Sequence, residues 1–168
     1  GAVAVVGDLE RARELAAEAE RIARTITNLG QQVWVLAAVA GAVAVVGDLE
    51  RARELAAEAE RIARTITNPD QQAQALSEVA EAMAEVGCHE RAEQIARTLT
   101  DPYQQAQALV GVAKVVGVAR AGHLLGEAFA LGSWLTPLPA LAKIQPQEVI
   151  RIAGAIYAAS LRVMPNRS

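Results

Sequence analysis

The chain has 168 residues, of which 52% are hydrophobic, 21% charged and 3% aromatic, and its formal net charge is −3. This weakly acidic balance argues against a nucleic-acid partner, because such binding draws on clustered Lys and Arg. The single cysteine, Cys88, excludes an internal disulfide and favours a reducing compartment, so we expect a cytoplasmic protein.

Self-comparison shows that the sequence is built from repeats. Residues 1–28 recur letter for letter at 41–68, and the segment 31–40 has looser copies at 71–80 and 104–113. The period is 40 residues and then 33, which is typical of stacked supersecondary units. We divide the chain into a repeat region over 1–131, with a partial repeat 1–30 and repeats 31–68, 69–101 and 102–131, and a C-terminal cap over 132–168.

Each repeat is expected to form a hairpin of two helices, here called A and B. In the first two repeats, helix B is expected to begin at Asp8 and at Asp48, because aspartate is a good N-cap and an apolar stripe comes after it. In the third repeat, helix A is expected from about Asp70 to Val86, closed by Gly87.

The charged residues of the B helices pair one helical turn apart, as Glu20 and Arg24 do, and we interpret them as a solvated face. Helical periodicity without strand-like alternation predicts an all-α chain of about seven helices.

The third repeat carries a pattern of apolar and small residues at fixed spacing, ending in a proline. Its members are Leu76, Val79, Ala80, Met83, Gly87, Ala92, Ala96 and Pro102. Over residues 1–130 this pattern resembles the tetratricopeptide repeat, W-x2-L-G-x2-Y…A-x3-F…P, with smaller residues in place of its Trp, Tyr and Phe. Other helical-hairpin repeat families are the alternative.

The resemblance implies an α-solenoid, that is, stacked helical hairpins in a right-handed superhelix with an irregular C-terminal capping helix. It also implies that the A helices line a concave face that binds a protein partner. The residues nominated in this way are Trp34, Gln74, Ser77, Glu81, Gln107 and Lys114.

The sequence holds few groups suited to catalysis or metal binding. Cys88, His89 and Glu90 are adjacent, but Cys88 takes the N-cap position that aspartate holds in the other copies, so we interpret the segment as an ordinary capping turn. Motifs for nucleophilic hydrolysis, phosphate binding and zinc binding are not present in the sequence. We therefore expect no catalytic residues, no cofactor and no metal, and a protein that is not an enzyme.

Residues 33–46 form an apolar run that is too short to span a bilayer, which needs ~20 residues, so no membrane association is expected. Trp34, Ala38 and Val45 stand where the third repeat has Gln74, Glu78 and Glu85. A helix that is apolar all round needs cover on every side. We expect these three residues and the stripe of 8–27 to form a self-association or partner surface.

The leading interpretation is a non-catalytic helical-repeat scaffold that binds protein and self-associates through its apolar N-terminal half as a homo-oligomer. The half-length first repeat has a second explanation, in which the chain is a fragment of a longer repeat protein with residues ahead of Gly1. The alternative functions are the regulatory repeat region of a larger signalling protein and a binder of small apolar ligands in a groove near Trp34.

Overall fold

The computed structural model describes residues 2–131, 137–144 and 147, with the backbone alone for 2–9, 138 and 144. Within these residues the chain forms eight helices and no strand, so the all-α prediction is confirmed. The helices are α1 (Ala2–Ala23), α2 (Leu29–Val45), α3 (Leu49–Ala63), α4 (Pro69–Glu85), α5 (His89–Thr98), α6 (Pro102–Ala113), α7 (Val118–Ala130) and α8 (Pro137–Ile144).

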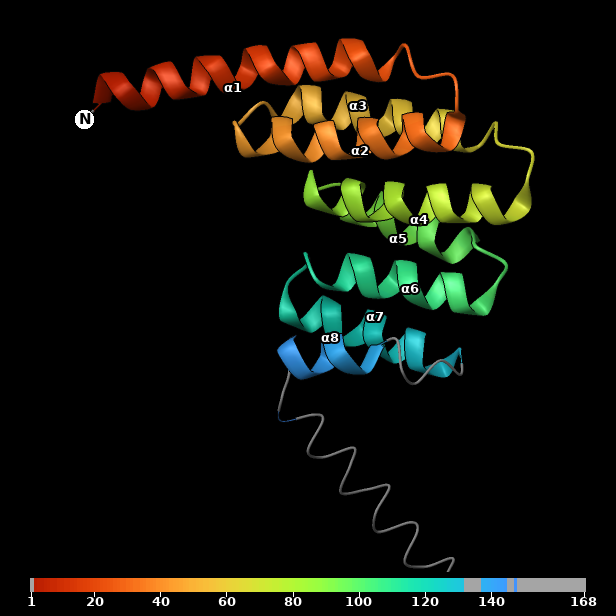
Figure 1. The fold of residues 1–168 in the computed structure, drawn as a ribbon. Helices are drawn as coiled ribbons and strands as arrows, with labels where there is room; N and C mark the ends of the chain where they lie inside the picture. Colours follow the sequence, from red (N-terminus) through yellow and green to blue (C-terminus); the bar gives the residue numbers. More distant parts are fainter. Residues whose placement is uncertain (1, 132–136, 145–146, 148–168) are drawn as a thin grey trace, which may run out of the picture.

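The helices pack in antiparallel pairs, and the pairs lie one after another (Figure 1). The A helices α2, α4 and α6 pack side by side in one layer, with the B helices α3, α5 and α7 behind them. Each of α3 and α5 also contacts the A helix of the next pair, and α8 packs against α6 and α7. At the other end of the row, α1 packs along α2, and its Glu20 side chain reaches Arg51 of α3.

The start of each A helix is fixed by the same two polar interactions. An Asn or Asp side chain before the helix accepts a hydrogen bond from the main-chain N–H three residues later, which satisfies one free donor of the first turn. These pairs are Asn28–Gln31, Asn68–Gln71 and Asp101–Gln104, at 3.0, 3.0 and 2.8 Å. The next glutamine donates its side-chain N–H to a main-chain carbonyl at the end of the preceding B helix, as Gln32 does to Ala23, Gln72 to Arg64 and Gln105 to Arg97.

The turns inside the first two complete hairpins depend on glycine. Gly47 and Gly87 have φ of 90° and 84°, a left-handed conformation that residues with a Cβ adopt at a cost. The Gly87 N–H donates to the Ala84 carbonyl at 3.0 Å and the Cys88 N–H donates to the Met83 carbonyl at 2.8 Å, which is the Schellman pattern. The predicted closure of helix A at Gly87 is confirmed.

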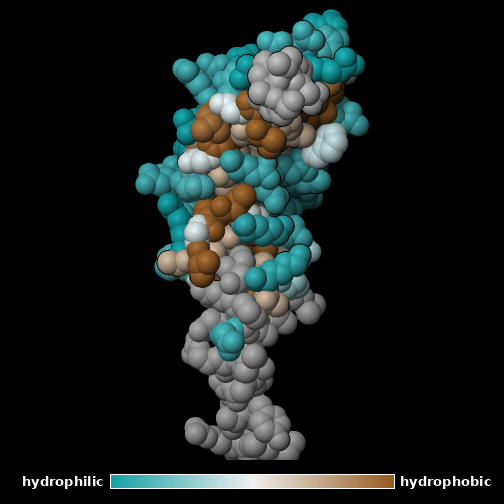
Figure 2. Space-filling view, turned by 90° about the vertical axis from the view of Figure 1, so that its left-hand side faces the viewer, coloured by the Kyte–Doolittle hydropathy of each residue, from teal (hydrophilic) through white to brown (hydrophobic). Residues whose placement is uncertain are grey.

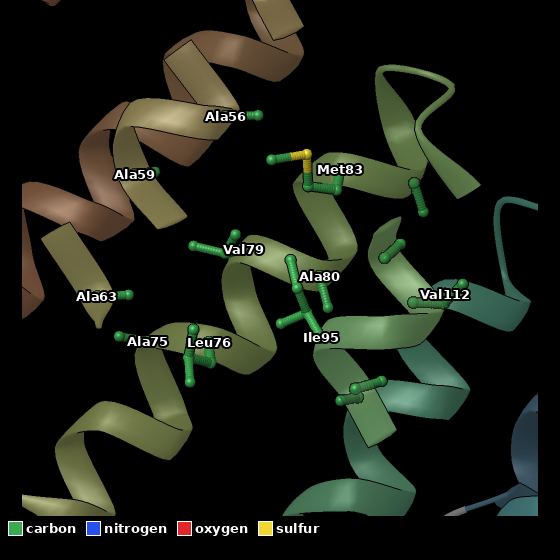
Figure 3. Close-up of a cluster of buried hydrophobic side chains, with 14 of the residues drawn as sticks. Ala56, Ala59, Ala63, Ala75, Leu76, Val79, Ala80, Met83, Ile95 and Val112 are labelled. Atoms are coloured by element: carbon green, nitrogen blue, oxygen red, sulfur yellow. The ribbon is translucent and has the colours of Figure 1, made fainter. Parts of the chain in front are cut away.

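Small side chains allow the two layers to approach closely. Figure 3 shows alanines of α3 facing the larger apolar side chains of α4, among them Leu76, Val79 and Met83. Ile95 of α5 lies on the other side of α4, and all of these residues are buried. The core is therefore continuous from one hairpin to the next.

The expectation that helix B of the first repeat begins at Asp8 is wrong. α1 runs unbroken through Gly7 and Asp8, although the identical residues Gly47 and Asp48 separate α2 from α3. In the second copy a 17-residue α2 precedes the turn and packs along α3, which holds the turn in place. In the first copy, residues 2–6 continue into α1, which gains main-chain hydrogen bonds without nucleating a separate helix.

The interpretation of the B-helix charges as a solvated face is wrong for three glutamates, which are buried. Each accepts hydrogen bonds from an arginine one turn later in its own helix and from an arginine of the next B helix. The sets are Glu20 with Arg24 and Arg51, Glu60 with Arg64 and Arg91, and Glu93 with Arg97 and Arg120. We call this series the Arg–Glu ladder; it connects four successive B helices.

The middle set shows how the ladder tolerates burial. Arg91 contacts both carboxylate oxygens of Glu60, with Nη2–Oε1 at 2.5 Å and Nε–Oε2 at 3.1 Å, and Arg64 contacts Oε1 at 2.8 Å. Burial alone would raise the pKa of Glu60, but the hydrogen bonds from Arg91 and Arg64 outweigh it, so the pKa lies below its ordinary value. A carboxylate shared by two arginines in this way stabilises the fold more than an exposed single pair does.

Candidate partner-binding face

The exposed surface of the A helices forms the candidate site, and we call it the A face. Its central residues are Trp34, Ala38, Val45, Gln74, Ser77, Glu78, Glu81, Glu85, Gln107 and Lys114. Equivalent positions of successive repeats have equivalent surroundings, because Trp34, Gln74 and Gln107 are all exposed. The structure therefore places every residue that the sequence nominated on one surface.

The apolar run of α2 is divided between the core and this surface. Val33, Leu36 and Val43 are buried, whereas Trp34 is 59% and Val45 87% exposed. The expectation that the run is covered on all sides is not met within the chain, because no described residue covers its outer side. The side that is polar in α4 is thus an apolar surface in α2.

Two grooves cross the A helices near their N-terminal ends. The first, of about 390 Å³, lies between α2 and α4 and is lined by Trp34, Gln31, Gln71, Gln74 and Glu78, among others. The second, of about 420 Å³, lies between α4 and α6 and includes Ser77, Tyr103, Gln104 and Gln107. Because Gln71, Gln74 and Glu78 line both, the two grooves form one surface rich in side-chain amides.

Several of these amides keep hydrogen-bonding capacity that the chain does not use. The side chains of Gln31 and Gln71 make no hydrogen bond to any described residue, while Gln107 donates to the Tyr103 hydroxyl at 2.8 Å. The side-chain carbonyl oxygen of Gln104 is buried and has no donor. An unpaired buried acceptor costs about 1–3 kcal/mol.

A third groove, of about 630 Å³, lies between α4, α6 and α8 and carries charges of both signs. Glu81 and Lys114 form an ion pair across it at 3.6 Å, and Lys143 of α8 lines its far side. Both members of the pair are exposed, so the pair contributes little to stability and is free to exchange partners.

The fourth groove, of about 490 Å³, lies near the turns of the hairpins and is the most apolar of the four. It is lined by Ala38, Val45, Leu49, Glu85 and Val115 together with small residues of α2. Figure 2 looks at the molecule from the side of these turns and shows apolar groups separated by polar ones along the stack. The A face therefore changes from amide-rich to apolar along the length of α2.

Glycines on the neighbouring helices bring the carboxylates of α4 close to the surface of the A face. A Cβ on Gly41 of α2 would lie 2.9 Å from Oε2 of Glu85, and one on Gly111 of α6 would lie 3.4 Å from Oε2 of Glu81. The two carboxylates thus extend over α2 and α6 at positions where a larger residue would displace them.

Partial burial leaves two of these carboxylates poorly solvated. Burial raises the pKa of Glu78, opposed by a hydrogen bond from Gln74 and assisted by the charge of Glu81. Burial and the charge of Glu81 also raise the pKa of Glu85. Among the described residues, neither Glu78 nor Glu85 forms an ion pair, in contrast to the ladder glutamates. The centre of the A face therefore has unneutralised negative charge.

Sequence reasoning missed Tyr103, Gln104, Glu78, Glu85 and Lys143 as lining residues. The position of Gln104 could have been predicted, because pairs of glutamines recur at 31–32, 71–72 and 104–105. The first glutamine of each pair lines a groove, and the second bonds to the preceding B helix. Lys143 could not be assigned, since α8 lies outside the repeat pattern.

Other kinds of site have less support in the described part of the chain. Cys88 lies at the N-cap of α5 and makes no side-chain capping hydrogen bond, and the adjacent His89 has a buried Nδ1 without a partner. In the described ranges no group of three or more His, Cys, Asp or Glu residues is placed to hold a metal ion. Nor is any described helix both long and apolar enough to cross a membrane.

Comparison with protein-family models gives no match to this chain, and comparisons with curated proteins and with solved structures give none either.

Proposed function

We propose that this chain is a non-catalytic α-solenoid of tetratricopeptide-like hairpins, with an irregular C-terminal cap, that holds proteins together in the cytoplasm. Its A face binds an extended segment of a partner. The unused amides across three A helices support this assignment, because an amide offers both a donor and an acceptor, as a peptide main chain requires. The single observation that carries it is the set of glutamines on the groove walls, Gln31 and Gln71 among them, whose side-chain amides make no hydrogen bond to any described residue.

The exposed aromatic side chains fit the same proposal. Trp34 and Tyr103 lie on α2 and α6 and are 59% and 56% exposed, one on each side of the amides of α4. Aromatic residues supply large contact area at little entropic cost, so they often anchor interfaces. The groove near Trp34 is lined mostly by Gln, Asn and Glu, which does not favour the alternative of a small apolar ligand.

The test uses peptides, because no partner is assumed. A random peptide library displayed on phage is selected against the full chain, and the affinity of each selected peptide is measured by calorimetry. We expect Trp34→Ala and Gln74→Ala to weaken binding about tenfold or more, as loss of an interface anchor does.

The matched control is Gln94→Ala, which makes the same change on α5, in the opposite layer. It should leave the affinity unchanged. If no peptide is selected, or if binding is indifferent to Trp34 and Gln74, the A face is not a peptide-binding site.

A second activity, self-association through the N-terminal half, is favoured by the distribution of exposed apolar side chains. Nine large ones are exposed among the residues whose side chains are described, and six of them lie between Leu15 and Leu49. Concentrated apolar surface of this kind marks an interaction site. Light scattering at increasing concentration tests it, and a chain that is monomeric throughout contradicts it.

A further inference from the structure

The outer side of α1 is an apolar surface whose identical counterpart is buried elsewhere in the same molecule. Leu15 and Ile22 are 62% and 51% exposed, whereas Leu55 and Ile62, at the same positions of the repeated segment, are 1% and 8% exposed. The difference lies in the neighbours, because α2 packs along α3 and no described helix takes that place on α1. Figure 1 shows α1 at the end of the row, with no described helix beyond it.

We call this surface the α1 edge and define it by Ala12, Leu15, Ala16, Ala19 and Ile22. A groove of about 280 Å³ runs along it between α1 and α2, lined by Ala12, Leu15, Ala16 and Ala19 together with Val39, Ala42 and Val46. Leu15 and Ile22 project seven residues apart, and the alanines between them leave hollows. Projecting residues and hollows on one helix, repeated every seven residues, suit packing against a second copy of the same helix.

The charges that border the α1 edge are also self-complementary. In α3, one arginine and one glutamate pair with the preceding B helix, as Arg51 does with Glu20 and Glu58 with Arg24. The matching residues of α1, Arg11 and Glu18, form no ion pair with another helix among the described residues. An antiparallel contact centred beside Leu15 brings Arg11 of each copy opposite Glu18 of the other.

We propose that the α1 edge is the contact between two copies of this chain, related by a two-fold axis near Leu15. The proposal rests on the self-association suggested above and identifies its surface. It separates this contact from the A face, so Trp34 and Val45 stay free in the dimer. An isologous contact closes on itself and gives a dimer, which presents two A faces to a partner.

The first experiment compares variants by light scattering. The wild type should have twice the mass of the chain at high micromolar concentration, and the double variant Leu15→Glu, Ile22→Glu should have the mass of one chain. Ala17→Glu is the control, because it adds the same charge at an exposed position outside the α1 edge. Circular dichroism should show equal helix content in all three proteins.

Two results would overturn different claims. A wild type that is monomeric throughout contradicts self-association itself. A dimer that persists in the Leu15→Glu, Ile22→Glu variant but dissociates with Trp34→Gln and Val45→Glu places the contact on the A face and overturns the α1 edge.

The two-fold register is tested by exchanging charges. Arg11→Glu should weaken the dimer, because it puts like charges opposite each other, and Arg11→Glu combined with Glu18→Arg should restore it. Failure of the combined variant to dimerise would overturn the antiparallel register.

A further variant covers the α1 edge within the chain. Placing a copy of residues 29–40 ahead of Gly1 completes helix A of the first repeat, so the added helix should occupy the edge and give a monomer. If this longer chain still dimerises, the contact lies elsewhere.

Discussion

α1 and α3 contain the same sequence in two surroundings. Between Gly7 and Asn28 every residue is matched between Gly47 and Asn68, yet the first glycine lies inside a helix and the second forms a turn. The apolar stripe is open in α1 and covered in α3. Local sequence thus permits both the continuous helix and the hairpin, and the packing around each copy decides between them.

The two copies agree where the next repeat contacts them. Glu20 and Glu60 are both buried, and each pairs with an arginine of the following B helix. Asn28 and Asn68 cap the following A helix in the same way, at 3.0 Å in both cases. The side of each repeat that packs against the next repeat therefore makes the same contacts in both copies. The side that packs against its own A helix is the one that differs.

The largest difference in stability between the two copies should come from truncating the matched leucines, Leu15 and Leu55. Leu55→Ala should lower the free energy of unfolding by about 2–5 kcal/mol, because it leaves a cavity in the core. Leu15→Ala should change it by less than about 0.5 kcal/mol under conditions in which the chain is monomeric, as exposed substitutions usually do. Urea titration followed by circular dichroism measures both. Equal losses would show that α1 is covered in solution in the same way as α3.

Substitutions in the ladder should affect the two copies alike. Glu60→Gln and Glu20→Gln should each cost about 1–3 kcal/mol at neutral pH, because each buried carboxylate loses charged hydrogen bonds. For Glu60 the loss should shrink as the pH falls. Its pKa is lowered in the folded state, so its ionised form stabilises the protein above its ordinary pKa and that stabilisation disappears on protonation.

Glu18→Gln, measured where the chain is monomeric, serves as the control, because among the described residues Glu18 pairs with Arg21 of its own exposed helix surface and with no other helix. Its effect should be smaller than that of either ladder variant. A Glu60→Gln loss that is undiminished in acid would show that the carboxylate acts by packing and not by charge.

Replacing the matched glycines Gly7 and Gly47 with alanine should have the smallest effects on stability, and the two effects should have opposite signs. Gly47→Ala should destabilise by about 1 kcal/mol, since its φ of 90° disfavours a Cβ even though no atom lies within 4 Å of it. Gly7→Ala should stabilise by about 0.5–1 kcal/mol, because alanine is the better residue inside a helix. Thermal melts of the two variants measure this difference. Destabilisation by both would mean that the first copy also turns at Gly7.

Much of the fold could be predicted from repeat alignment alone. The A helices, their glycine and proline boundaries and the shared surface of Trp34, Gln74 and Gln107 can be deduced from period and spacing, because these features depend on residues close together in the sequence. The continuity of α1 could not, since the sequence around Gly7 is the same as that around Gly47.

The Arg–Glu ladder also could not be predicted from the sequence of any single helix. Glu60 and Arg64 are correctly expected to pair one turn apart, but burial of Glu60 depends on Arg91, in the next B helix. The same limit applies to the carboxylates of α4, whose positions depend on Gly41 and Gly111 in two other helices. To predict contacts between repeats, one must know which residues of neighbouring helices lie side by side, and the repeat period alone does not give this.

The Arg–Glu ladder has a consequence for how further repeats can be added to the chain. Arg51 is the copy of Arg11. One repeat therefore contains both a glutamate that pairs with the next repeat and an arginine that pairs with the glutamate of the preceding repeat, as Arg51 does with Glu20. A tandem duplication of the whole unit therefore reproduces a matched junction at once, with no compensating mutation required. The array can therefore be lengthened or shortened in whole units while each new junction stays neutralised.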